Sequence, residues 1–387
     1  MAKITTSLFG ELAIIPQPAE TPVRETLEFL TDVMTSHNGS EERIPLRSKP
    51  RQFFNYKIPT QAWASAAAFN TLYGAVRQRW AVPIWTEAQY VGNVIQNAPT
   101  IACNTSLYDL RPNSLAMLFA SCGEWQVIEI ASVEENQITL SSAVRSFVGS
   151  WLLPVRLGWI GGNASKPTSG HNGRVELTFE IDDNPSILES VPTQYEGSDI
   201  YYEPGLLSGG SLSRSIEKRL DVADFALGPV ARRSPWLNSR FATPYRSLLE
   251  GPQEIRDFKR WLFRRAGKFR PFWQPTFEVN MRVKNTGVVA STLVIESDSY
   301  LAYVSNRTRI AIQTTAGAWH VRTVSNPVQI NADSVQLTLS SALNVAASNI
   351  ARVSFLGLNR LDADRIELNW NGNNVVETEI RILELNP

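Results

Sequence analysis

The chain has 387 residues, enough for two ordinary domains that each bury a hydrophobic core. Its 37 basic and 37 acidic side chains balance, which excludes an overall field that would draw the protein to nucleic acid or to an anionic membrane. Only 19% of the residues are charged although the chain contains 11 Trp and 16 Phe, and this composition favours a surface covered by subunit contacts.

The first segment, residues 1–47, is predicted to be extended and to form an arm. The turn signal His37-Asn38-Gly39 is followed by the stretch from Glu41 to Arg51, whose prolines exclude a helix and favour an edge strand. We interpret the basic side chains here, among them Arg43 and Arg51, as solvated or intersubunit groups; contact with phosphate is the alternative.

Residues 48–185 are predicted to form a first module. A helix at about 61–79 places Phe69, Leu72, Tyr73 and Val76 on one apolar face. Short apolar runs split by Asn, Gly and Ser then predict a β barrel at about 100–160 and a closing strand at about 174–181.

Residues 186–240 are predicted to be a linker and a second arm, and residues 241–387 a second module. The Gly/Ser-rich passage from Tyr195 to Ser213 is typical of a long loop, and the segment from Glu217 to Trp236 resembles the first arm. The second module is predicted to contain a helix at about 252–266, a β barrel at about 286–358 and closing strands at about 365–385.

The two modules share motifs in the same order, which predicts an internal duplication. Tyr56 and Tyr245 open matching segments that close on Pro83-Ile84-Trp85 and Pro271-Phe272-Trp273. The strand around Trp125 matches that around Trp319, residues 137–144 match residues 336–343, and residues 174–179 match residues 365–370, all at nearly constant spacing. The predicted fold class is α+β, mainly β: a duplicated module made of an extended arm, one amphipathic helix and antiparallel β sheet or barrel structure.

Signals of catalysis and of metal binding are weak. Cys103 and Cys122 form no ligand cluster with His37, His171 or His320, and the fixed spacings of nucleophile, phosphate and dinucleotide motifs are absent, so we expect no enzyme, cofactor or metal. The paired carboxylates Asp182-Asp183, and Asp362 with Asp364, suit acid–base work in a glycosidase, but solvated turns at strand ends explain them more simply.

The tryptophans divide into two groups. Trp85, Trp125, Trp273 and Trp319 recur at matching places and are expected to pack in a repeated core. A carbohydrate platform, if present, would draw on the others: Trp63, Trp80, Trp151, Trp159, Trp236 and Trp261. No run approaches the roughly 20 apolar residues of a membrane span, and no secretory signal is expected.

These motifs resemble the distal-tail and baseplate proteins of long-tailed bacteriophages (siphophages). The resemblance rests on the arm with Glu41, Arg43, Pro50 and Arg51, on the aromatic Tyr56, and on the helix, basic turn and Pro-x-Trp that follow. The passage from Trp125 to Val144 is similar to the small β barrel inserted in such tail proteins.

The resemblance implies a structural protein of the virion, at the tail tip or baseplate, synthesised in the bacterial cytoplasm. Its ring would connect the tail tube to the hub and the adsorption apparatus, with other tail proteins, including the tape measure, as partners and DNA passing transiently through the lumen. A duplicated chain suits a homotrimer with pseudo-sixfold symmetry, and a true hexamer is the alternative.

Two other functions remain open from the residues: a carbohydrate-binding adsorption module and, third, a cell-wall hydrolase. The candidate interface and structural residues are Arg43, Arg51, Tyr56, Pro83, Trp85, Trp125, Arg232, Arg233, Trp236, Tyr245, Pro271, Trp273 and Trp319.

Overall fold

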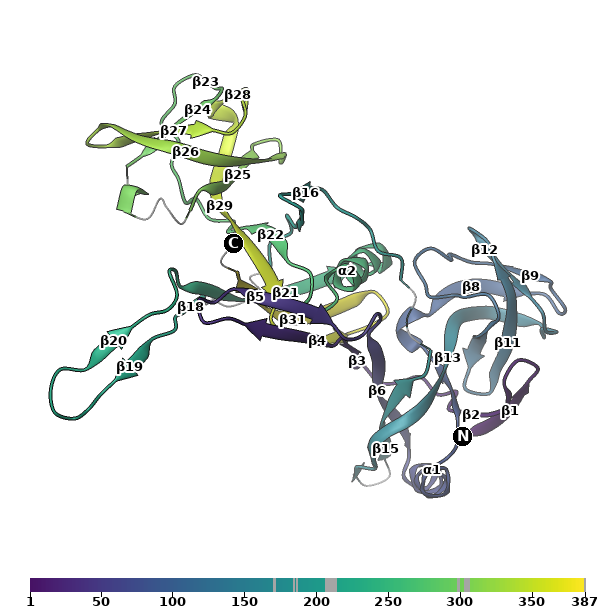
Figure 1. Cartoon of the computed structure of the whole chain (residues 1–387). Helices are drawn as coiled ribbons and strands as arrows, with labels where there is room; N and C mark the ends of the chain where they lie inside the picture. Colours follow the sequence, from purple (N-terminus) through teal and green to yellow (C-terminus); the bar gives the residue numbers. More distant parts are fainter. Residues whose placement is uncertain are drawn as a thin grey trace.

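The computed structural model describes residues 1–169, 172–183, 185, 187–205, 214–297, 300–302 and 307–385. Its elements confirm the predicted mainly β, α+β class: antiparallel strands dominate, and two α-helices accompany them in the described part (Figure 1). His171 and the Ser208 to Ser211 stretch of the predicted linker lie outside the described residues. We call residues 1–183 the N-terminal half and residues 187–385 the C-terminal half.

One antiparallel sheet runs through both halves. Hydrogen-bonded neighbours follow one another in the order β7, β13, β15, β6, β3, β30, β31, β21, β18. Their bounds are β7 (Trp80–Pro83), β13 (Phe147–Ser165), β15 (Asn172–Ile181), β6 (Arg51–Gln61), β3 (Val23–Glu28), β30 (Arg365–Trp370), β31 (Val375–Glu384), β21 (Arg240–Glu250) and β18 (Ser215–Glu217). Buried and exposed residues alternate along β6, β21 and β31, as in strands with one face in a core. The two halves join where β3 pairs with β30.

Further strands extend this sheet at its ends. β2 (Gly10–Ile14) runs parallel to β7 and pairs with β1 (Ala2–Thr6), while β17 (Ser198–Ile200) runs parallel to β22 (Phe272–Pro275) and pairs with β16 (Gln194–Tyr195). β22 in turn pairs with β29 (Ile350–Leu361), whose end also meets β31.

Each half carries a curled sheet with its own apolar core. In the N-terminal half the pairing order is β8 (Gln89–Val94), β13, β10 (Ser114–Ser121), β11 (Glu124–Val133), β12 (Gln137–Leu140) and β9 (Thr100–Ala102). In the C-terminal half it is β29, β25 (Arg309–Thr314), β26 (Trp319–Asn331), β27 (Ser334–Leu339) and β24 (Thr292–Glu296). Buried aliphatic side chains such as Ile128 and Leu337 fill the two cores.

Short elements complete the described part of the chain. They are β14 (Thr168–Ser169), β23 (Val288–Val289), β28 (Val345–Ala346) and the 3₁₀ turns η1 (Trp85–Glu87), η2 (Tyr300–Ala302) and η4 (Ala347–Asn349). Among the described residues no helix is long and apolar enough to cross a membrane.

The two helices follow directly on matching strands. α1 (Ala62–Gly74) follows β6 and ends at Gly74, five residues short of the predicted end at 79, where the Ala75 N–H donates to the Leu72 carbonyl. α2 (Pro252–Arg265) follows β21 with the predicted bounds: Pro252 lies in the first turn, and Ala266 adopts the left-handed conformation with φ 50° after the last turn. A Cβ on Gly267 would lie 2.2 Å from an Asp364 oxygen, so only glycine fits there.

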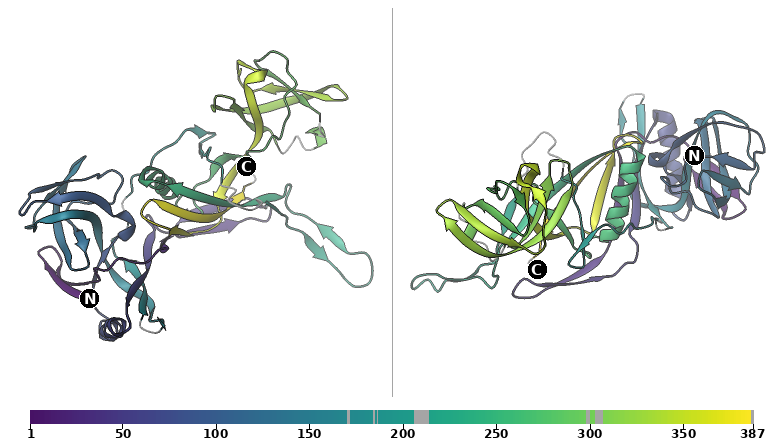
Figure 2. Two further views of the ribbon diagram at one scale, coloured as in Figure 1. Left: turned by 180° about the vertical axis from the view of Figure 1, so that it is seen from behind. Right: turned by 90° about the horizontal axis from the view of Figure 1, so that it is seen from above.

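Two β-hairpins leave the sheet as arms. The first arm is β4 (Thr31–Thr35) with β5 (Glu41–Pro45), and the second arm is β19 (Asp221–Ala223) with β20 (Ala231–Arg233). The stretch from Glu41 to Arg51, predicted as one extended segment, is therefore the return strand of a hairpin followed by the start of β6. The first arm lies along β21 and β31, whereas the second arm projects away from the rest of the molecule (Figures 1 and 2).

The strands of the two halves pair in the same order and register. β7 pairs with β13 and with the parallel β2, as β22 pairs with β29 and with the parallel β17. β6 lies between β3 and β15, as β21 lies between β18 and β31. At one constant spacing along the sequence, Glu28 opposite Arg51 corresponds to Glu217 opposite Arg240, and Asp32 opposite Ile44 corresponds to Asp221 opposite Arg233.

Candidate functional site

The first arm is held on the C-terminal half by a buried carboxylate. Glu41 accepts hydrogen bonds from Arg240 at 2.8 Å and from Arg360 at 2.8 Å, and the side chains of all three are at most 7% exposed. Burial by itself raises the pKa of Glu41, but the hydrogen bond and charge of Arg360, followed by those of Arg240, outweigh it and leave the pKa below its usual value. The charged carboxylate thus fastens the arm to β21 and β29.

The neighbouring contacts of the first arm are also specific. The Thr31 N–H donates to Asp364 at 2.9 Å, and its hydroxyl donates to the same carboxylate at 3.0 Å. Gly39, with φ +91°, lies so close to Trp236 that an added Cβ would be 3.0 Å from the indole nitrogen. Arg43 is half-buried beside these groups, and burial lowers its pKa. The turn and both strands of the first arm therefore fit the C-terminal half closely.

A buried polar cluster lies where α2 covers the N-terminal half. Lys259 of α2 contacts Glu25 of β3 at 2.9 Å and Glu87 of η1 at 3.6 Å. The Trp370 indole and the Gln52 amide also donate to Glu25, at 3.0 and 2.7 Å. Burial lowers the pKa of Lys259, but the charges of Glu25 and Glu87 outweigh it and raise the pKa, so the ammonium stays charged in the interior.

The second arm has the opposite environment. Both of its strands are exposed throughout, including Arg232 and Arg233, and so is the turn, where Phe225 is 81% and Leu227 95% exposed. An exposed hairpin with large apolar side chains at its tip is typical of a segment that binds a partner.

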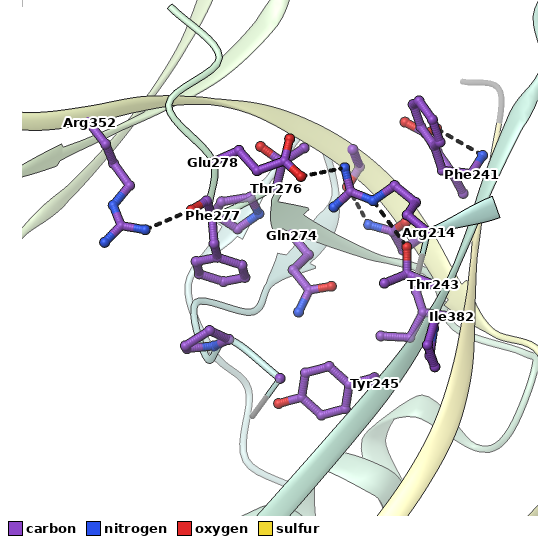
Figure 3. A pocket seen from close by; sticks show the side chains of 17 residues that line it. Arg214, Phe241, Thr243, Tyr245, Gln274, Thr276, Phe277, Glu278, Arg352 and Ile382 are labelled. Carbon is purple, nitrogen blue, oxygen red and sulfur yellow. Dashed lines mark hydrogen bonds and ion pairs between the residues drawn. The ribbon is translucent and has the colours of Figure 1, made fainter. Parts of the chain in front are cut away.

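An open groove lies at the base of the second arm, between β21, β22 and β29. Its volume is about 440 Å³, and Figure 3 shows the side chains that line it. Arg214 lies over the Phe241 ring, 5.4 Å from its centroid, and contacts Glu278 at 3.4 Å and the Thr243 hydroxyl at 3.3 Å. On the opposite wall Arg352 donates to the Phe277 carbonyl at 2.8 Å. The groove thus combines aromatic walls with two guanidinium groups, of which Arg214 is paired with Glu278.

The carboxylates considered for acid–base chemistry lie in ion pairs. Asp183 contacts Arg111 at 3.3 Å and Arg156 at 3.6 Å, and Asp182 contacts Arg79 at 3.0 Å. Burial raises the pKa of Asp183 in spite of these cations.

Asp109 holds the same two arginines, at 2.6 Å to Arg111 and 2.9 Å to Arg156. Burial raises its pKa, but Arg156 and Arg111 outweigh this and lower the pKa to about 2. These contacts tie the end of β15 and the loop before β10 to β13, and they give the carboxylates a structural role. In the described part of the chain no group of three or more His, Cys, Asp or Glu side chains is placed to hold a metal ion.

The predicted structural residues fall into three environments. Tyr56, Pro83, Tyr245 and Trp273 are buried in the sheet: the Tyr56 hydroxyl donates to the Pro83 carbonyl at 2.8 Å, and the Trp273 indole donates to the Tyr195 carbonyl at 2.8 Å.

A second set lies partly buried at the edges of cores. Trp85 packs edge-on against Phe119, and Trp319 stacks on Tyr202. Trp125 packs against the core below β10, the Pro271 carbonyl accepts a bond from Arg265, and Trp236 lies under Arg240. Arg51 is exposed, and the side chain of Trp63 lies outside the described residues.

Two of the predicted motif matches share a register and two do not. Trp125 lies opposite Phe119 as Trp319 lies opposite Gln313, and Ile138 opposite Ile101 corresponds to Leu337 opposite Leu293. The match of Trp85 with Trp273 is shifted, because Pro83 and Pro275 end equivalent strands. The match of β15 with β30 is also wrong: β31, not β30, lies beside β21 as β15 lies beside β6.

The most specific residues of the site were not singled out from the sequence. Glu25 is one acidic residue in an ordinary short strand, and nothing local predicts that it meets a helix of the other half. Lys259 carries a usable signal, because it lies four residues after Ile255 and three before Leu262, on the apolar face of α2.

No protein-family model matches the sequence, and no curated protein matches it.

Proposed function

We propose that the protein is a structural, ring-forming subunit built from two copies of one module. The observation that supports this most directly is the contrast between the arms: the first arm is clamped on the C-terminal half of its own chain, and the equivalent second arm extends away from the chain. A second arm that binds the N-terminal half of the next copy would repeat the internal contact between chains.

The shared strand pairings support the duplication. Both halves contain a short strand, a hairpin, an eleven-residue strand, a helix and a strand flanked by a parallel neighbour, in the same order and with matching registers. The long strand β13 corresponds to β29 and β30 together. β13 pairs with β15 in the N-terminal half, and β30 pairs with the equivalent strand β31 in the C-terminal half. Because pairing register is set over many residues, agreement at so many pairs favours a common origin for the two halves.

A head-to-tail contact of this kind determines the type of assembly. It is heterologous, so it must either close into a ring or continue as a filament. Three copies would present six similar modules, which fits a sixfold tube, and a homotrimer with pseudo-sixfold symmetry is therefore the proposed form; a hexamer is the alternative.

We place this ring at the tail tip or baseplate of a long-tailed bacteriophage. The motif resemblance, the even charge balance and the apolar tip of the second arm support this place, in which the ring would join the tail tube to the hub and leave a lumen for DNA. Other tail proteins would then be its neighbours, and DNA a transient occupant of the lumen.

Mass photometry of the purified protein tests the assembly, and three-dimensional averaging of virions tests the location. We expect the purified protein to form a closed ring of three chains, and the virion average to show density for this ring at the tail tip. A variant in which residues 219–235 are replaced by a short Gly/Ser link should remain a folded monomer. A wild-type protein that stays monomeric and is absent from particles would rule out both the trimer and the hexamer.

A carbohydrate-binding function is the second candidate, and one aromatic pair favours it. Tyr90 and Trp151 lie on neighbouring strands with ring centroids 5.5 Å apart, and they are 62% and 40% exposed. Exposed rings of this kind can stack on a sugar. Binding on a glycan array that is lost in Trp151→Ala would support this function, and no binding by the wild type would exclude it for the glycans tested.

A further inference from the structure

The outer face of α1 has a composition that is unusual for a helix in water. Residues 62–74 contain no charged side chain, whereas the equivalent residues 252–264 of α2 contain six. Ala68 and Leu72 pack against the core of the N-terminal half, whereas Tyr73 of α1 is 89% exposed and Val76, just after the helix, is 84% exposed. The exposed side also carries the polar Asn70 and Thr71 but no charge, and a large exposed ring on an uncharged helix face is typical of a surface that a partner covers.

The equivalent face of α2 shows what such a surface covers. Gln61 and Gly251 precede the two helices, so Phe69 and Tyr73 of α1 hold the positions of Lys259 and Phe263 in α2. Lys259 is the partner of Glu25, and Phe263 packs edge-on against Phe29 with centroids 6.0 Å apart. This face of α2 therefore closes the N-terminal half around β3.

The corresponding place in the C-terminal half is the open groove. β18 pairs with β21 in the register in which β3 pairs with β6, which puts Arg214 at the place of Glu25 and Phe241 at the place of Gln52. In the N-terminal half these positions are covered by α2 and buried, with Glu25 fully inaccessible. In the C-terminal half they line the groove shown in Figure 3, and Val279 beside it is 61% exposed.

We propose that α1 of a second copy of this chain docks in the open groove, with Phe69 and Tyr73 facing Arg214 and Phe241. This inference rests on the proposed ring, because the same head-to-tail arrangement brings the second arm and α1 together on one interface. The docking repeats between chains the contact that α2 makes within the chain.

The chemistry of the two surfaces is complementary and selects α1 over α2. An uncharged helix face with two aromatic rings can cover an arginine, since a guanidinium binds favourably on an aromatic face. Lys259 of α2 would instead meet Arg214 as a like charge. At equivalent positions the N-terminal half has Glu25 where the C-terminal half has Arg214, and α2 has Lys259 where α1 has Phe69. Each helix therefore suits one site: α2 suits the site around Glu25, and α1 suits the groove around Arg214.

The first test changes Tyr73, whose side chain is so exposed that its substitution should not disturb the fold. In Tyr73→Lys a new positive charge would face Arg214 in the interface, and we expect the concentration for half-assembly to rise roughly tenfold or more. Ile95→Lys, at a residue 78% exposed in the loop after β8, is the matched control and should assemble normally. Equal assembly of both variants by mass photometry would overturn the proposal.

The second test rebuilds the internal pair between chains. Phe69→Lys and Arg214→Glu should each weaken assembly, and the double variant should recover it, because it recreates the Lys259–Glu25 contact at the new interface. Circular dichroism identifies any variant that is unfolded. Rings that form in every folded variant would refute the docking while leaving the ring itself intact, whereas a wild-type protein without rings would refute the proposed function.

A cysteine pair gives direct evidence of contact. Lys218 corresponds to Phe29, so Tyr73→Cys and Lys218→Cys in one chain, with Cys122→Ser to remove an exposed thiol, should form disulfides between copies under oxidation. A ladder that ends at the closed oligomer is expected on a denaturing gel. Purely monomeric chains, from a protein that assembles, would contradict the proposed contact.

Discussion

The two halves use the same elements, but only one of them is covered. The N-terminal half is closed by α2, and its arm is fastened by Glu41 to Arg240 and Arg360. The C-terminal half keeps an open groove, and its arm, the second arm, is free. The helix equivalent to α2 is α1, which lies on the N-terminal half with its outer face exposed. In the proposed ring, the contact within the chain is repeated between chains.

The largest expected effect on the free energy of unfolding comes from removing Lys259, which covers the N-terminal half through Glu25. Lys259→Met leaves Glu25 buried without its cation, and removal of one partner of a buried pair costs about 3–5 kcal/mol of the free energy of unfolding. Chemical denaturation measures this. The double variant with Glu25→Gln should recover part of the loss, and an equal loss in both variants would show that the charge pair is not the cause.

The arm contact should contribute less but still measurably. Glu41→Gln removes the charge shared by Arg240 and Arg360, and we expect a loss of about 2 kcal/mol in unfolding free energy. The corresponding position on the second arm is Val230, and Val230→Gln should leave the stability of the isolated chain within about 0.5 kcal/mol. A comparable loss at both positions would contradict the contrast between the arms.

Charge reversal on the free arm separates stability from assembly. Arg232→Glu with Arg233→Glu should leave the melting temperature unchanged, because both residues are exposed in the chain. If these residues form contacts between subunits, mass photometry will show reduced assembly. If instead they line the lumen, rings will form normally and phage ejection will be impaired.

Acid should remove the contribution that the ion pairs of Asp109 make to stability. The folded-state pKa of Asp109 is depressed to about 2 from 3.8, so its contribution is present above the unfolded value and is lost as pH falls from about 4 to about 2. Asp109→Asn should be less stable at pH 7 and should show a smaller fall in stability across that window. Asp224→Asn, on the exposed second arm, serves as the control and should follow the wild type.

The sequence was sufficient for features whose signal is local. Pro252 and Gly267 predict α2 to within one residue at its end, and strands lie around Trp125 and Trp319 as expected, because the alternation of side chains extends over many residues there. α1 was predicted too long, since Val76 continues the apolar pattern beyond Gly74, where the helix ends.

The sequence was insufficient where contacts join distant residues. β15 was matched to β30 because both carry an Arg-x-Glu-x pattern, whereas a turn after Leu361 divides the second long strand in two, so that β31 takes the equivalent place. The pairing of β3 with β30, the burial of Glu25 and the clamp at Glu41 each join residues more than 190 positions apart, and one sequence contains no local signal for such pairs.

The pairing of β3 with β30 also constrains how the chain is made. Residues 23–28 emerge from the ribosome long before residues 365–370, so a hydrogen-bonding edge and the arm beside it wait without their partner during most of synthesis. A neighbouring nascent chain that is further advanced can offer its own β30 to that edge. Production rate and temperature should therefore determine how much of the protein folds correctly and how much becomes entangled through exchanged strands.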